Sequence, residues 1–214
     1  GAKGINFVYT NGGGVADYRG YGRARRPLLP ALGVPTTAGT GSDAQSYALI
    51  SDADTGEKIA CGDLGAAFGA VILDPRLPRS APPEVTAASG LDAVAHAVES
   101  FVTTKRNPRA QEYAGAAWRL LNGAIETVIA GRANDRAWSE MHLGAHLAGA
   151  AIELSMLGAA HATANPLTAR HGVKHGAAVM LMLPWVVRFN AEVCEPLYRR
   201  LHGNGRSPGG AEAL

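Results

Sequence analysis

The segment GLDAVAHAVES, residues 90–100, decides how this sequence is interpreted. It favours a helix over 91–103, so Asp92 and His96 share one face and lie roughly 5.4 Å apart along the helix axis. A second segment, LGAAHATANPLTARHGVKHG at 157–176, contains three histidines, of which His161 and His175 lie fourteen positions apart. One carboxylate and three imidazoles form a complete ligand set for a borderline divalent metal such as iron or zinc. The sequence therefore predicts a metal site made by Asp92, His96, His161 and His175.

Histidines four positions apart also arise by chance on helices. His142 and His146 have the same spacing with no carboxylate beside them, and we interpret that pair as helix surface or core filling. The same explanation, histidines that are merely packed, stands as the alternative for the set around Asp92. It would make this chain a metal-free scaffold.

Composition excludes some classes of partner. The 214 residues carry a net charge of +2, and 18% of them are charged. This is too small an excess of basic residues to indicate binding to nucleic acid or to an anionic membrane. Two cysteines are too few for a disulfide framework, which favours a reducing, cytoplasmic location. The most apolar stretch, 143–160, contains His146 and Glu153 and is expected to be a buried helix rather than a membrane span.

The chain changes character near two consecutive prolines at 82–83. Before them, short apolar runs are broken by Gly and Pro, which predicts an α/β domain over 1–82 with the run GAVILDP as a strand covered on both faces. After them the pattern is helical, which predicts an all-α domain over 83–214. Strands are expected at VYT near position 8 and at 31–37, 46–52, 57–62 and 69–75.

Helix boundaries are also predicted from local signals. Asn134 or Asp135 can cap a helix that Gly158 is placed to end. A last helix is expected from His175 through Ala191, kinked at the proline inside it.

The loop PTTAGTGSD, 35–43, follows a predicted strand. Its glycines and hydroxyl side chains can bring backbone N–H groups against a phosphate or ribose. It has neither the Walker lysine nor the spacing of a G-x-G-x-x-G fingerprint, and most such loops are plain turns.

Taken in order, PTTAGTGSD, the strand ending ILDP, GLDAVAHAVES and the segment at 157–176 resemble the iron-containing (group III) alcohol dehydrogenases, within the dehydroquinate synthase-like superfamily. The resemblance implies a partial Rossmann-like, nucleotide-binding α/β domain followed by an all-helical domain. It implies hydride transfer between a small alcohol or aldehyde and NAD or NADP, with Fe²⁺ as the metal and Zn²⁺ as the alternative. It also implies a homodimer or larger assembly.

The resemblance assigns roles to individual residues. Asp92, His96, His161 and His175 would be the metal ligands, the last two counted as catalytic. Asn165 would also be catalytic, standing where many members have a histidine near the nicotinamide or substrate. The dinucleotide would be lined by Thr36, Thr37, Gly39 and Thr40, with Tyr47 flanking it and Lys58 reaching a ribose or phosphate oxygen.

The sequence also departs from the family. Residues 1–4 resemble the tail of a helix that follows the family's pyrophosphate loop. We therefore expect this chain to be an internal piece of a longer protein. The isolated piece could then be inactive. The choice between NAD and NADP stays open. A non-redox NAD- and metal-dependent enzyme, similar to dehydroquinate synthase, is the second alternative.

Overall fold

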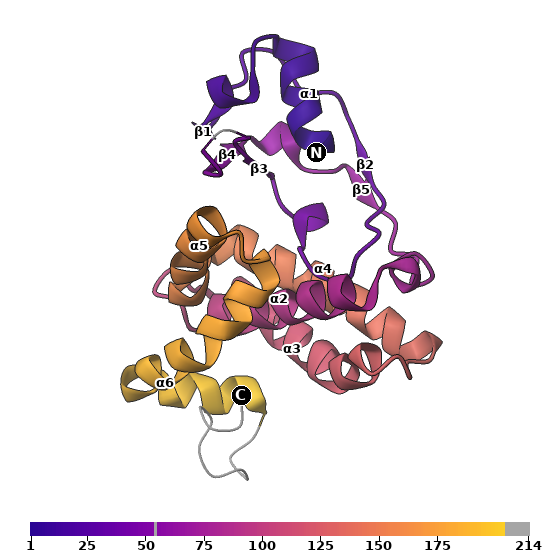
Figure 1. The fold of residues 1–214 in the computed structure, drawn as a ribbon, viewed down its shortest axis with the longest axis vertical. Coiled ribbons are helices and arrows are strands. Elements are labelled where there is room, and N and C mark those ends of the chain that lie inside the picture. The colour runs from indigo at the N-terminus through magenta and orange to yellow at the C-terminus, as the bar shows by residue number, and fades with distance from the viewer. Residues whose placement is uncertain (54, 204–214) are drawn as a thin grey trace.

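The computed structural model describes residues 1–53 and 55–203. Figure 1 shows a small part of mixed strands and helix, followed in the chain by a larger, wholly helical part. The predicted fold class, α/β and then all-α, is confirmed. The division at residues 82 and 83 stays a prediction, and positions 204–214 of the predicted second domain lie outside the described residues.

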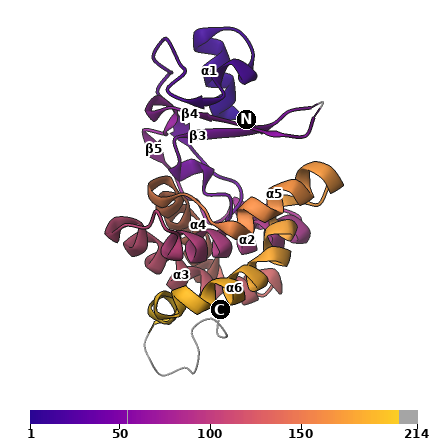
Figure 2. The same cartoon turned by 90° about the vertical axis from the view of Figure 1, so that its left-hand side faces the viewer.

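Among the described residues, the N-terminal part holds one α-helix, five short strands and several 3-10 turns. In one sheet β4 lies between two neighbours, parallel to β1 and antiparallel to β3, while β2 and β5 form a separate parallel pair. The β3–β4 hairpin runs out over α5 (Figure 2). The bounds are α1 Ala2–Asn11, β1 Gly20–Tyr21, β2 Leu32–Gly33, β3 Tyr47–Ser51, β4 Lys58–Gly62 and β5 Ala70–Val71.

Strands lie within the predicted ranges 31–37, 46–52, 57–62 and 69–75, but the prediction at VYT is wrong and the strands at 31–37 and 69–75 are only two residues long. The run VYT lies in α1, whose amphipathic pattern buries Phe7 (1% exposed) and leaves Tyr9 77% exposed. A short apolar run fits either element, and here the helical period decides. The predicted strand at 69–75 contains only Ala70–Val71, and Ile72 is 55% exposed, so GAVILDP is not covered on both faces within the described structure.

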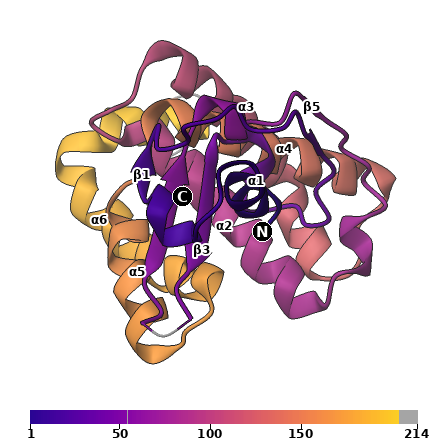
Figure 3. The same ribbon diagram turned by 90° about the horizontal axis from the view of Figure 1, so that it is seen from above.

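Five helices form the second part, and Figure 3 views them beneath α1 and the strands. Helix α2 packs against α3, α4 and α6, and its rows of buried alanines let neighbouring backbones approach closely. Asn107 and Asn134 cap α3 and α4 by accepting backbone N–H groups, the second as predicted. The bounds are α2 Pro83–Val102, α3 Pro108–Ile129, α4 Asp135–Ser155, α5 Ala159–His171 and α6 His175–His202.

The apolar stretch predicted as one helix is broken. Helices α4 and α5 meet at an angle of 101°, and Met156 between them has φ +64° and ψ −175°. Gly158 therefore begins α5 as its N-cap instead of ending α4. Helix α6 continues to His202, beyond the predicted end at Ala191. The sharp break aims the first turn of α5 back toward α2.

By length and composition α6 is the one helix among the described residues that could cross a membrane unaided. A core helix of a soluble protein passes the same test. In this structure α6 packs against α2 and α5.

Candidate metal centre

Three helices contribute the predicted ligands. Asp92 and His96 lie one turn apart on the buried face of α2, each 4% exposed. His161 lies in the first turn of α5 and is also 4% exposed, while His175 is the first residue of α6. The structure thus brings all four predicted side chains to one place.

The distances suit a shared cation. The carboxylate of Asp92 lies 3.2 Å from His161 Nε2, 3.6 Å from His96 Nε2 and 3.9 Å from His175 Nε2. The two longer distances exceed a hydrogen bond, so these rings converge on the carboxylate without bonding to it. Two donors that each lie about 2.1 Å from one ion are at most roughly 4.2 Å apart, and the three separations measured from the Asp92 carboxylate meet that limit. Ligand atoms of Asp92, His96 and His161 lie within 4.8 Å of one another, whereas His175 falls outside that group and approaches it through Asp92.

Burial and charge set the protonation of the metal-free cluster. Burial opposes ionisation of Asp92, but the imidazoles facing it outweigh that effect and hold its pKa at about 2. Burial lowers the pKa of His96 to about 4 and also lowers the pKa of His175. Burial acts in the same direction on His161, yet hydrogen bonds to two carboxylates raise its pKa to about 9. At neutral pH a cation would therefore replace one proton, on His161.

A cavity of about 950 Å³ joins this cluster to the α/β part. Most residues predicted to hold a dinucleotide line it, and so does Asn165. Gly39 does not: a Cβ there would lie 2.3 Å from the Ser89 carbonyl oxygen, so this glycine packs its backbone against α2. The predicted residues in the cavity wall are Thr36, Thr37, Thr40, Tyr47, Lys58, Asn165 and the four ligands.

Further residues around the site were not predicted from the sequence. Glu99 is 3% exposed and its carboxylate lies 2.5 Å from His161 Nδ1. Glu153 in α4 accepts hydrogen bonds from the backbone and hydroxyl of Ser46 and lines the cavity. Met156 also lines it. Of these residues, only Glu99 could have been proposed from the sequence, because it follows His96 by three positions and so lies on the same helix face.

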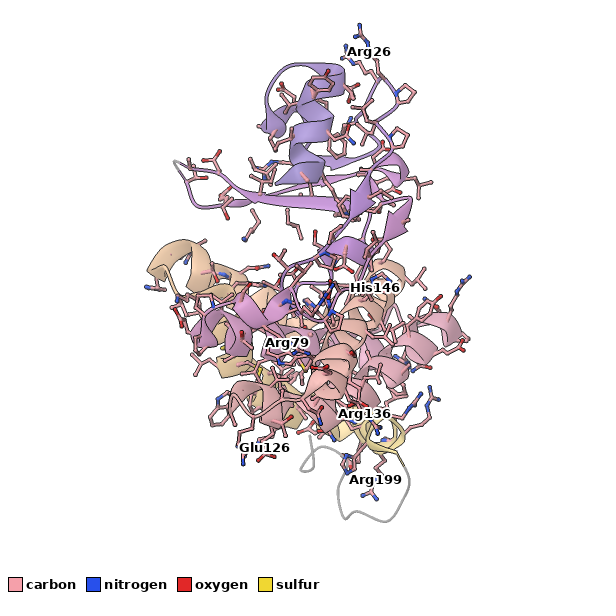
Figure 4. The ribbon with its side chains drawn as sticks, turned by 90° about the vertical axis from the view of Figure 1, so that its right-hand side faces the viewer. Arg26, Arg79, Glu126, Arg136, His146 and Arg199 are labelled. Carbon is pink, nitrogen blue, oxygen red and sulfur yellow. The ribbon has the colours of Figure 1, made fainter. Side chains whose placement is uncertain are left out.

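The histidine pair of α4 lies outside the cluster. His142 is 2% exposed, and its ring is buried beside the backbone of Asp74. His146 Nδ1 lies 2.5 Å from Asp43 Oδ2, and Figure 4 places it on the side of α4 nearest the α/β part. Neither belongs to a group of three candidate ligands among those residues.

Comparison with known proteins identifies the family. The profile described as "Fe-containing alcohol dehydrogenase family, C-terminal" matches residues 86–207, more than half of the chain, and the profile "Iron-containing alcohol dehydrogenase" matches 1–75. The chain belongs to the iron-containing alcohol dehydrogenase family. The resemblance drawn from the four sequence motifs is therefore confirmed.

Relatives in this family are identical to the chain at about a third of the aligned positions. Alcohol dehydrogenase 4 of Schizosaccharomyces pombe is 34% identical over 190 residues, which are 89% of this chain and 45% of the relative. The NAD-dependent methanol dehydrogenase of Bacillus methanolicus is 31% identical over 88% of this chain and 50% of its own length. The chain thus spans about half the length of the curated relatives it matches.

Solved structures of the family have the same fold. A 1,3-propanediol oxidoreductase superposes with a TM-score of 0.88 at 30% identity, covering 99% of this chain and 56% of that one. A sulfoacetaldehyde reductase from Bifidobacterium kashiwanohense, solved in complex with NAD⁺, has a TM-score of 0.83 at 30% identity over 93% of this chain and 54% of its own.

Proposed function

We propose that this chain carries the metal centre and part of the dinucleotide site of an NAD(P)-dependent alcohol dehydrogenase. The reaction would move a hydride between the carbinol carbon of a small alcohol and the nicotinamide, yielding an aldehyde, reduced coenzyme and one proton. The observation that carries the proposal is the single cavity that contains both the carboxylate–imidazole cluster and the hydroxyl-rich loop at 35–43.

The residues at one end of the cavity would bind the metal ion. Asp92, His96, His161 and His175 would hold a divalent cation, Fe²⁺ or Zn²⁺. When bound, such a cation supplies Lewis acidity that lowers the pKa of an alcohol hydroxyl and polarises an aldehyde carbonyl. Four protein donors leave room for a substrate only at a five- or six-coordinate ion, which favours Fe²⁺.

The coenzyme would lie along the other wall of the cavity. Thr36, Thr37 and Thr40 present hydroxyl groups there, and Lys58 brings a cation suited to a phosphate oxygen. Asn165 lies one turn beyond His161 on α5 and can donate or accept a hydrogen bond beside the substrate. Met156 and Leu157 cover part of the same wall with apolar surface, which limits water near the transferring hydride.

The test uses the 214-residue chain and two variants of α5. We expect the wild type to bind one equivalent of Fe²⁺ or Zn²⁺ by elemental analysis, and to bind NADH with a change in its fluorescence. His161→Ala should lose the metal. His171→Ala, the matched control, should keep it because His171 is exposed at the far end of the same helix.

Turnover separates the remaining alternatives. NADH formed from NAD⁺ and a short alcohol, in the chain or in a longer protein that contains it, supports the dehydrogenase. A dehydroquinate synthase-like enzyme returns its NAD unchanged, so no net NADH would accumulate. A scaffold would bind no metal even after reconstitution, and an equivalent of metal retained by His161→Ala would contradict the ligand assignment.

A further inference from the structure

Glu99 is a buried carboxylate that the proposed reaction leaves unused. It lies on α2 three residues after His96 and seven after Asp92, so it occupies the same face of the helix, one turn further along. Its side chain is 3% exposed, and among the described residues its ion-pair partner is His161. An ionised carboxylate this deeply buried requires hydrogen bonds to offset its lost hydration.

Both carboxylate oxygens meet the first turn of α5. Oε1 accepts the backbone N–H of Ala160 at 2.7 Å, and Oε2 lies 2.5 Å from the Nδ1 atom of His161. The residue at the N-cap, Gly158, contributes no side-chain cap, so Glu99 supplies the missing acceptor from another helix. A Cβ at position 158 would lie 2.7 Å from Oε1, which explains why a glycine stands there.

The contact at Nδ1 determines what the opposite nitrogen can do. Once His161 has given up the proton between Nε2 and Asp92, the neutral ring keeps one proton, and a hydrogen bond donated from Nδ1 to Glu99 leaves the lone pair on Nε2. That atom faces the Asp92 carboxylate at 3.2 Å. The Nδ1 atoms of His96 and His175 are also buried, yet within the described structure neither has a hydrogen-bond partner. Of the three imidazoles, His161 is therefore the one whose ring is held by a hydrogen bond at the nitrogen that faces away from Asp92.

We propose that Glu99 is a positioning residue, which fixes the ring and tautomer of His161 for cation binding and anchors α5 to α2. The inference rests on the proposed metal centre. Partners of this kind behind a histidine ligand typically change metal affinity by about 10- to 100-fold when they are removed.

The experiment compares Glu99→Gln with Val98→Ala in the 214-residue chain. The glutamine keeps the volume, but one of its two polar atoms becomes an NH₂ group, which faces either the Ala160 N–H or the His161 Nδ1–H. Val98 is 2% exposed and packs in the core on the same helix, so its truncation weakens α2 and removes no hydrogen bond to His161. Thermal unfolding of both variants establishes that each is folded.

Co²⁺ is the probe, titrated in competition with a chelating dye. We expect Glu99→Gln to bind Co²⁺ about 10- to 100-fold more weakly and to change its visible absorption bands. Val98→Ala should match the wild type in both respects despite its lower stability. Equal affinity and equal spectra for Glu99→Gln would overturn the role of Glu99 while leaving the metal centre intact. A wild type that binds no Co²⁺ would overturn both.

A measurement on the wild type avoids dependence on the variant. In Zn²⁺-loaded protein labelled with ¹⁵N-histidine, we expect the His161 ring to carry its proton on Nδ1 and to bind zinc through Nε2. The His161 signal is assigned in the metal-free protein as the one that disappears in His161→Asn, and it is then followed as Zn²⁺ is added to the wild type. A proton on Nε2, or zinc bound through Nδ1, would overturn the proposal whatever the behaviour of Glu99→Gln.

Discussion

Replacing Gly149 by alanine tests the contact that joins the two parts of the molecule. Gly149 lies in α4, with its backbone against Gly41 of the hydroxyl-rich loop. A Cβ at position 149 would lie 2.4 Å from the Gly41 oxygen and 2.6 Å from its Cα. Real Cβ atoms essentially never approach closer than 3.0 Å, so the loop must retreat by about 0.6 Å or more.

The expected change in unfolding free energy for Gly149→Ala is the sum of opposing effects. Alanine in a helix interior is favoured over glycine by about 1 kcal/mol. Overpacking a dense contact costs about 1–3 kcal/mol. The retreat also stretches the bonds from Asp43 to His146 and from Ser46 to Glu153, each a charged hydrogen bond contributing about 1.5–3 kcal/mol. We expect Gly149→Ala to lose about 1–3 kcal/mol of unfolding free energy, roughly 5 °C in Tm.

Urea unfolding measures the change, and Gly123→Ala is the matched control. Gly123 is a helix-interior glycine of α3, and a Cβ added there would meet no heavy atom within 4 Å, so alanine should raise the unfolding free energy by about 1 kcal/mol. Gly149→Ala should also weaken NADH binding, because the loop moves, while Co²⁺ affinity stays at the wild-type value. If Gly149→Ala stabilised the protein as much as Gly123→Ala does, the close approach of α4 to this loop would be refuted.

Two further predictions concern single side chains near the cavity. Burial lowers the pKa of Lys3 from 10.5 to about 8, although the charges of Glu153 and Asp43 act in the opposite direction. The buried ammonium group therefore destabilises the folded state below pH 8. This destabilisation disappears as the pH rises from 8 to 10.5, because Lys3 loses its proton in the folded state first. Relative to Lys3→Met, the wild type should gain on the order of 3 kcal/mol of unfolding free energy across that window, and a pH-independent difference would contradict the prediction. Met156 has a backbone conformation that is essentially restricted to glycine and costs about 1–3 kcal/mol, so Met156→Gly should be more stable than Met156→Ala in thermal unfolding. The reverse order would show that no strain is stored there.

The helical part was predictable because its signals are local. The helices containing GLDAVAHAVES and the run after Asn107 have apolar positions at helical spacing, and Asn134 is a cap residue that caps as expected. The break between α4 and α5 has no such signal. It requires Met156 at positive φ, which nothing in the local sequence favours, and surrounding structure imposes it. The strand prediction at VYT failed because a three-residue apolar run does not show which element its neighbours form.

The part of the site that lies on a single helix was predictable from the sequence. Asp92 and His96 share a face of α2, and helical geometry alone places them together. His161 and His175 join them through contacts between helices, so their grouping rested on motif and family resemblance. Glu99 was missed although it lies on the same face, because a glutamate on a helix is usually solvated and its burial depends on where α5 begins.

Glycines at helix contacts explain how distant ligands can meet. At Gly176, directly after His175, a Cβ would lie 2.1 Å from the Ala88 carbonyl oxygen of α2, and at Gly39 it would lie 2.3 Å from that of Ser89. The start of α6 and the hydroxyl-rich loop therefore both pack against one turn of α2, which lies just before Asp92. Any larger residue at either glycine would push a ligand or the loop away from the carboxylate. Geometry at the centre thus depends on residues that carry no ligand atom.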